Sequence, residues 1–368
     1  MRGCLWWGFL FCFVWGDVSM GQVNVEESVY GETADGRTVV RYDLSNGTGM
    51  RVSVLNYGAM LIGVEVPNRE GEVANVTLYL DEWSDYESGH PLFGSVVGRF
   101  ANRIDGGGFE IDGVRFDLET VNARTGVHVH GGKTGFQRQV WEGAVEELGV
   151  ALSLVSPDGH EGYPGEVAAT VRYLLAKEGM AFRIHYEATT TKATHVNLTN
   201  HADWNLGGAG SGDVLDHELQ LEADQILELD ERKIPTGGYV DVAGGPWDFL
   251  EARRIGEGIG GTEGGYDHCY VLSMAEERVL RSFARLHDPE SGRVMEIATT
   301  QPGVQIYSAN FGDGKRGAGE RMYGRHEGIC FETQHYPNAP NEAGFPSTLL
   351  RPGERYFEEA VFSFSVND

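Results

Sequence analysis

Short runs of alternating apolar and polar residues, separated by turn-forming residues, extend along most of the chain. Residues that favour strands, either β-branched or alternating in polarity, dominate 51–66, 150–155, 166–175, 180–188 and 217–223. Glycine, proline, asparagine and aspartate mark turns at 68–71, 157–159, 177–179 and 288–292. Many short strands at this spacing predict an all-β fold, either a sandwich or a barrel.

Helical periodicity is nearly absent from the chain. We expect one short helix at 81–88 (DEWSDYES) and a second at 248–255, with glycine-rich loops at 207–212 and 256–265. After residue 21 there is no linker, repeat or shift in composition. The sequence therefore predicts one large domain that spans residues 22–368.

The first 21 residues differ from the rest of the chain. Arg2 is followed by the continuous apolar run GCLWWGFLFCFVW, and Ser19-Met20-Gly21 offers a small-residue cleavage site. This run is too short to span a bilayer, which takes about 20 residues. The pattern predicts a signal peptide at 1–21, hence a secreted or periplasmic protein that begins at Gln22. The alternative, a buried first strand, is disfavoured by the density of aromatic residues.

The net charge limits the kinds of partner that we expect, and the cysteine content limits the disulfides. The 368 residues carry 29 Lys and Arg against 55 Asp and Glu, a formal net charge of -26. Such a surface repels nucleic acid and anionic lipid, so we expect neither as a partner once the signal is removed. We expect a monomer. Only Cys269 and Cys330 remain in the mature chain; one bridge is possible, but two buried free thiols are favoured.

Six segments combine His, Asp, Glu, Arg or amide side chains with aromatic residues. A neutral polyhydroxylated ligand needs this mixture, because rings cover its C–H faces while charged and amide groups bind its hydroxyls. The segments are 98–104, 127–132, 197–206, 264–272, 301–310 and 332–340.

The segment GVHVHGG contains two histidines, His128 and His130, with strand spacing, so their rings could share a face and bind a metal. No carboxylate follows until Glu142, and Lys133 stands beside the pair. Transition metals usually take three or more ligands. We therefore expect no metal at this pair, and consider a metal-dependent β-barrel enzyme a weaker alternative.

Several long motifs give this chain a resemblance to the galactose mutarotase (aldose 1-epimerase) family between about residues 28 and 363. They are GSVVGRFANRI, HVHGGKTGFQRQVW, PDGHEGYPGEV, NLTNHADWNL, KIPTGGYVDVAGGPWDF, GGYDHCYVL, TTQPGVQIYSANF and ETQHYPNAPNEAGFPSTLLRPGERY. The resemblance implies a large antiparallel β-sandwich. It also implies a cofactor-independent isomerase that interconverts the α and β anomers of free hexoses of the glucose or galactose type.

The resemblance also assigns roles to residues. Glu332, in ETQ after the apolar run 328–331, would be the base, and burial at a strand end should raise its pKa. His201, in the NH motif, would be the acid. Sugar-binding residues would be His130, Asp267, Asn102, Arg103 and, more weakly, Gln305; Arg99 is the alternative to Arg103 because spacing cannot separate them.

The chain departs from the family pattern at two places. Asp203-Trp204 stands where the family usually has an aromatic pair, which we interpret as a changed pocket wall that affects substrate preference. Cys269 replaces a common amide near Asp267. Two further alternatives are a sugar-binding protein without turnover and an epimerase of another or modified aldose, such as a hexose 6-phosphate.

Overall fold

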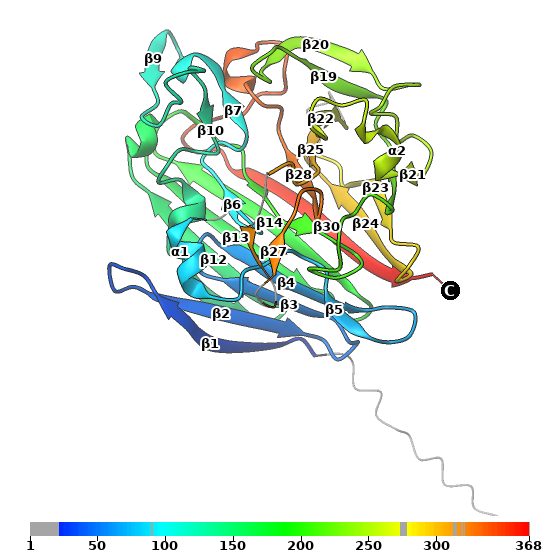
Figure 1. Cartoon of the computed structure of the whole chain (residues 1–368). Coiled ribbons are helices and arrows are strands. Elements are labelled where there is room, and N and C mark those ends of the chain that lie inside the picture. The colour runs from blue at the N-terminus through cyan, green and yellow to red at the C-terminus, as the bar shows by residue number, and fades with distance from the viewer. Residues whose placement is uncertain are drawn as a thin grey trace, which may run out of the picture.

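A computed structural model describes residues 22–367, except 90, 273–277, 312–314, 318 and 320. The predicted signal peptide at 1–21 lies outside the described residues. Three large antiparallel sheets form the molecule (Figure 1). In chain order, the first contains β1 (Asn24–Glu32), β2 (Thr38–Ser45), β3 (Arg51–Leu55), β4 (Met60–Pro67) and β5 (Val73–Asn75).

The second sheet has nine strands and includes the C-terminal strand near its centre. Its order is β11 (Glu142–Glu146), β12 (Gly149–Ser156), β13 (Val167–Leu175), β14 (Ala181–Thr190), β30 (Tyr356–Val366), β24 (Arg293–Thr299), β23 (Arg281–His287), β18 (Glu218–Leu221) and β21 (Arg253–Arg254).

The third sheet has six strands and carries the candidate site. Its order is β17 (Asp203–Trp204), β28 (Ile329–Gln334), β25 (Gly303–Tyr307), β22 (Asp267–Val271), β19 (Gln225–Leu229) and β20 (Pro235–Asp241). Two-stranded pairs complete the described structure: β6 (Val96–Val97) with β16 (Thr199–Asn200), β7 (Arg103–Ile104) with β10 (His128–Val129), β8 (Gly108–Ile111) with β9 (Val114–Asp117), β15 (Thr194–His195) with β29 (Leu349–Leu350), and β26 (Lys315–Arg316) with β27 (Met322–Tyr323).

One hydrophobic core joins the three sheets. Side chains on β13 alternate between buried and more exposed positions along the strand, as a sheet with one covered face requires. The buried cluster contains Val54 of the first sheet, Tyr173 of the second and Ile306 of the third. Trp204 extends this core, since its ring stacks on Phe362 with centroids 5.1 Å apart. The predicted antiparallel β-sandwich is confirmed.

The helix predictions are half correct. Helix α1 (Trp83–Ser88) lies within the first predicted helix. The second prediction was wrong, because Asp248 accepts backbone N–H groups from Gly244 and Leu250 and so stabilises a turn. Helix α2 (Ile255–Ile259) instead occupies part of a segment that we expected to be a loop, while 207–212 is a loop as expected. Within the described residues, no helix is both long and apolar enough to cross a membrane.

Candidate active site

The register of the six-stranded sheet brings the candidate residues together. Glu332 on β28 lies directly opposite Gln305 on β25, which lies opposite Cys269 on β22. Alternate residues of a strand share a face, so the row of residues two positions away on each strand lies on the same side of the sheet. This second row runs across four strands, through Asp203, Cys330, Tyr307 and Asp267.

Glu332 is a buried carboxylate without a full set of partners. Its side chain is 3% exposed, and its Oε2 atom is enclosed without a hydrogen-bond partner. Burial raises the pKa of Glu332 to about 7, against the opposing effect of the His201 ring. A carboxylate whose pKa lies near neutral pH can accept and release a proton at working pH, as a general base must.

His201 lies beside this carboxylate. Its Nε2 atom is 3.8 Å from Glu332 Oε1, and its Nδ1 atom is 3.6 Å from Asp203 Oδ2. Burial alone would lower the pKa of His201, but the carboxylates of Glu332 and Asp203 raise it to about 9. The ring is therefore protonated near neutral pH and can serve as a proton donor, the role that the family resemblance implies for it.

Asp267 gathers three donors at the other end of this face. Arg103 Nη2 and Lys233 Nζ donate to its Oδ2 atom at 3.0 and 3.2 Å, and Gln305 Nε2 donates to its Oδ1 atom at 2.6 Å. Burial alone would raise the pKa of Asp267, but Arg103 and Lys233 lower it to about 2. This ionised carboxylate and its cations form an anchor for hydroxyl groups.

Sequence reasoning did not select Lys233, although the KIPTGG motif contains it. Lys233 adopts a left-handed φ of 61° in the turn between β19 and β20, and its side chain reaches Asp267 on β22, the strand on the other side of β19. Nothing in the local sequence signals that reach. Tyr307 was missed too; its half-buried ring lies 6.2 Å from that of His201 and adds an aromatic surface.

His130 and Asn102 form a second edge of the site. The backbone N–H of Asn102 donates to His130 Nδ1 at 3.2 Å, and the His130 N–H donates to the Asn102 carbonyl at 2.9 Å. Burial lowers the pKa of His130 to about 3, so the ring is neutral. Because Nδ1 accepts, the ring proton is on Nε2 and can be donated to a ligand oxygen. The His130 and His201 ring centroids are 5.7 Å apart.

His128 and His130 do not share a face. His128 begins β10, and its ring packs on Tyr163 with ring centroids 5.6 Å apart, whereas His130 follows the strand with a left-handed φ of 52° and turns away. The glycine pair that follows is needed for packing, because a Cβ at Gly131 would collide with the Gly98 carbonyl and one at Gly132 with the Glu161 side chain. The shared-face interpretation of the two histidines was therefore wrong.

Arg99 lies outside the candidate site, which corrects its place among the sugar-binding residues. Its side chain is buried, and its guanidinium donates to Ser156 Oγ and to four backbone carbonyls. All three guanidinium nitrogens of Arg99 donate to these acceptors, whereas Arg103 donates to Asp267. The carbonyl acceptors belong to Ser156, Pro157, Pro164 and Gly165.

Asp203 does not line the pocket wall as we predicted. The carboxylate is 1% exposed and lies behind the His201 ring, opposite Cys330. Cys330 Sγ is also 3.6 Å from His201 Nδ1. Cys330 and Cys269 are both buried free thiols, as expected. The substitution at Cys269 does not deprive Asp267 of partners, since Gln305 reaches it from the next strand.

Two groups of three side chains could each hold a metal ion by distance, because their ligand atoms lie within 4.8 Å of one another. One group is His130, His201 and Glu332, and the other is His201, Asp203 and Cys330. Their donor chemistry fits a metal poorly. Burial raises the pKa of the Cys330 thiol well above its usual range, and metals bind the thiolate. His130 already uses Nδ1 as an acceptor and carries its proton on Nε2.

Comparisons with known proteins agree with this geometry. The family model of aldose 1-epimerase matches residues 40–363. The chain is 41% identical to galactose mutarotase of Sus scrofa over 347 residues, 94% of this chain and 99% of that protein. It is 33% identical to aldose 1-epimerase of Escherichia coli K12 over 339 residues, 90% of this chain and 96% of that protein.

Solved structures support the same assignment. Galactose 1-epimerase from Lactobacillus acidophilus NCFM superposes with a TM-score of 0.80 at 28% identity, covering 94% of this chain and all of that one. A GalM/aldose epimerase homologue from C. elegans gives a TM-score of 0.81 at 28% identity, covering 88% of this chain and 97% of that one. The chain therefore belongs to the aldose 1-epimerase family of isomerases.

Proposed function

We propose that this protein interconverts the α and β anomers of a free hexose of the glucose or galactose type. The observation that carries the proposal is the buried pair of Glu332 and His201, whose facing atoms are 3.8 Å apart. The two oxygens bonded to C1 of a cyclic sugar are close neighbours. A base for one and an acid for the other must therefore lie near each other, as Glu332 and His201 do.

The proton transfers balance over one cycle. Glu332 takes the proton of the C1 hydroxyl while His201 Nε2 protonates the ring oxygen, and the bond between C1 and the ring oxygen breaks. The aldehyde then rotates about the C1–C2 bond. On closure, neutral His201 accepts the proton of the attacking hydroxyl as Glu332 protonates the carbonyl oxygen. Both residues return to their starting states with the configuration at C1 exchanged.

The surrounding residues hold the sugar in place. Asp267 accepts from ring hydroxyls, and Arg103 and Lys233 keep its charge fixed. His130 donates from Nε2 near the ring oxygen, and the side chains of Asn102 and Gln305 offer further hydrogen bonds. The Oε1 atom of Gln305 is buried without a partner, which leaves an acceptor free.

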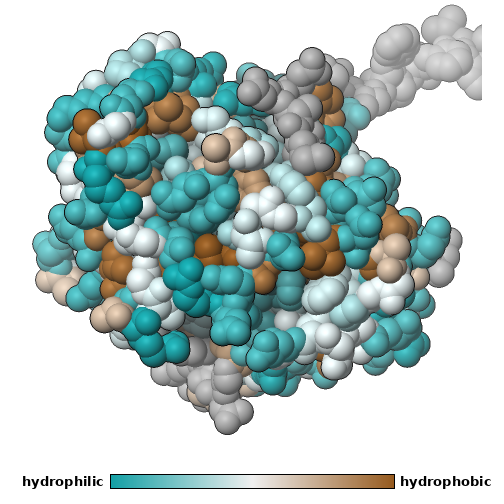
Figure 2. Space-filling model, turned by 90° about the horizontal axis from the view of Figure 1, so that it is seen from above, coloured by the Kyte–Doolittle hydropathy of each residue, from teal (hydrophilic) through white to brown (hydrophobic). Residues whose placement is uncertain are grey.

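The surface favours a monomer as the working form. Exposed large apolar side chains of the described residues include Val29 on β1, Val114 on β9 and Val155 on β12, three strands that belong to three different sheets. The face in Figure 2 is largely hydrophilic, with smaller apolar patches between the polar side chains. We also infer export from the charge and apolar pattern of 1–21.

Polarimetry tests the activity. Freshly dissolved α-D-glucose and α-D-galactose should reach their anomeric equilibrium faster with the protein than in buffer. A His201→Asn variant should lose about 10²–10⁴-fold of the acceleration, the usual contribution of a positioned acid. Binding of both sugars without any acceleration would mean a sugar-binding protein without turnover.

A further inference from the structure

We propose that Asp203 is a positioning residue for the proton donor: it holds the His201 ring through Nδ1 and keeps it charged, so that Nε2 presents a proton to the sugar ring oxygen. This inference rests on the proposed function and adds a third member to the pair of Glu332 and His201. It gives a chemical role to the residue at which the chain departs from the family pattern.

The geometry behind the ring supports this role. Asp203 Oδ2 lies 3.6 Å from His201 Nδ1, on the side of the ring opposite Nε2, which faces Glu332 Oε1. Both Asp203 oxygens are enclosed and have no hydrogen-bond partner. An unpaired buried carboxylate is costly, because it has lost water and gained no compensating charge. The His201 ring, when protonated, supplies that charge.

The placement of Asp203 follows from the sheet register. After His201 the chain enters β17, whose two residues pair with β28 so that Asp203 lies opposite Cys330. Cys330 and Glu332 are alternate residues of β28 and share a face. The strand that carries the base therefore also fixes the distance from the carboxylate to the ring. The titratable groups around His201 are Asp203 from β17, Cys330 and Glu332 from β28, Tyr307 from β25, and His130 from the turn after β10.

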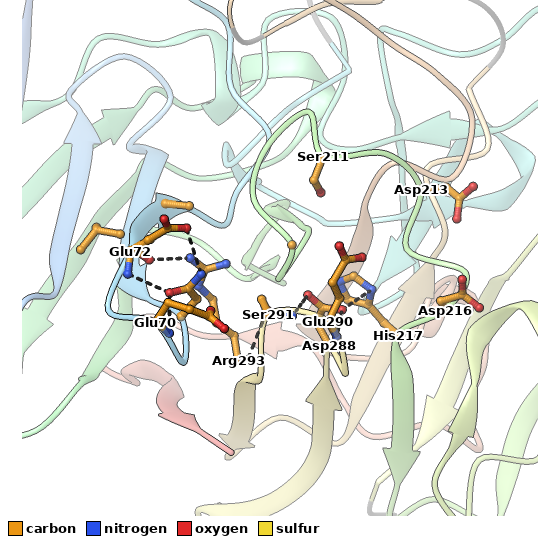
Figure 3. A pocket seen from close by; sticks show the side chains of 14 residues that line it. Glu70, Glu72, Ser211, Asp213, Asp216, His217, Asp288, Glu290, Ser291 and Arg293 are labelled. Carbon is orange, nitrogen blue, oxygen red and sulfur yellow. Dashed lines mark hydrogen bonds and ion pairs between the residues drawn. The ribbon is translucent and has the colours of Figure 1, made fainter. Parts of the chain in front are cut away.

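A second buried histidine in the same molecule offers a comparison (Figure 3). His217 Nδ1 lies 3.9 Å from Asp288 Oδ1, and both residues are buried. The Asp288 oxygens already accept the backbone N–H groups of Glu290 and Ser291, so their charge is shared. Burial lowers the pKa of His217 to about 4 despite Asp288, whereas the pKa of His201 is raised to about 9. The carboxylate of Glu332 has the larger effect on the pKa of His201, and Asp203, which accepts no backbone N–H as Asp288 does, adds to it; together they account for the difference.

The reaction explains why a charged partner is useful. Burial raises the pKa of Glu332 to about 7, so Glu332 is an ionised base only at and above neutral pH. A histidine with an ordinary pKa near 6.5 would already be losing its proton there. Few molecules would then have both groups in the reactive state. By keeping His201 charged to higher pH, Asp203 widens the range in which acid and base are ready together.

The test compares the pH dependence of kcat/KM for wild type, Asp203→Asn and the matched control Asp288→Asn, all by polarimetry. The neutral amide should move the alkaline limb down toward pH 6.5, by one pH unit or more. At pH values above the pKa of His201, each further pH unit reduces the protonated fraction of the ring about tenfold. The acidic limb should move down too, because Asp203 also raises the pKa of Glu332. Asp288→Asn should leave both limbs in place.

A loss of rate that is uniform across pH would overturn the proposal, as would equal shifts in the control. If Asp203→Asn does not fold, as judged by its thermal melt, Asp203→Ser removes the same charge from a smaller side chain. NMR titration of the His201 ring, assigned with His201→Asn, needs no active enzyme. A wild-type pKa at or below 6.5 would refute the inference. An inactive wild type with a high His201 pKa would instead refute the proposed function alone.

Discussion

Replacing Asp267 by Asn tests the anchor, because one carboxylate supports both the fold and sugar binding. The pKa of Asp267 is lowered from 3.8 to about 2. Since one pKa unit equals about 1.4 kcal/mol, the ionised form gains about 2 kcal/mol from its cations. Part of this is screened, because the Lys233 side chain is 42% exposed. We expect Asp267→Asn to lower the free energy of unfolding at pH 7 by about 2 kcal/mol.

The pH dependence of that loss has a defined sign. A carboxylate whose pKa is depressed in the folded state contributes stability above its unfolded pKa, here 3.8. That contribution disappears as the pH falls through the folded value of about 2. Urea unfolding should therefore show a constant difference between wild type and Asp267→Asn at pH 5–8, and a shrinking difference below pH 4.

The same variant should weaken substrate binding. A hydrogen bond to a charged group contributes about 1.5–3 kcal/mol, so KM should rise about tenfold to a hundredfold with a smaller change in kcat. The control is Asp112→Asn, whose pair with Arg351 is exposed and should matter little. Equal unfolding free energies at pH 7, a difference that widens in acid, or an unchanged KM would contradict the reasoning.

Three further outcomes are expected. The rate of wild type should follow a bell with apparent pKa values near 7 and 9, rising as Glu332 ionises and falling as His201 loses its proton; a rate independent of pH between 6 and 10 would exclude this pair. Arg99→Leu should cost about 3 kcal/mol in urea unfolding, because buried carbonyls lose their donor, while KM stays the same; a raised KM in folded protein would return Arg99 to the site. Mass spectrometry of exported protein should find an N-terminus at Gln22, whereas an intact Met1 on soluble cytoplasmic protein would contradict the signal peptide.

Much of the fold could be predicted because strand alternation and turn residues are local signals. Helix α1 was found in the same way. The helix predicted at 248–255 was wrong because the Asp248 side chain binds nearby backbone N–H groups, a competition that periodicity does not reveal. The order of strands in the three sheets has no local signal, and it decides which residues become neighbours.

The candidate site shows the same division. The motifs identify Glu332, His201 and Asp267. The sheet register brings Glu332 and Asp267 to one face of the six-stranded sheet, and His201 lies 3.8 Å from Glu332. Sequence spacing could not separate Arg99 from Arg103, because only the backbone path shows which guanidinium meets carbonyls and which meets a carboxylate. Asp203 was assigned to the wrong position for a similar reason, since its pairing with β28 depends on a strand more than a hundred residues away.

Polarimetry of Glu332→Gln beside wild type tests the central claim most directly. The control is Glu358→Gln, which changes another buried carboxylate of raised pKa. Glu358 lies on β30 of the nine-stranded sheet, where its partners are Thr300 and Arg278 and not the proposed acid–base pair. We predict that wild type and Glu358→Gln speed the anomeric equilibration of α-D-glucose or α-D-galactose, while Glu332→Gln loses about 10²–10⁴-fold of that acceleration. A folded Glu332→Gln variant that equilibrates either sugar as fast as wild type would contradict the account.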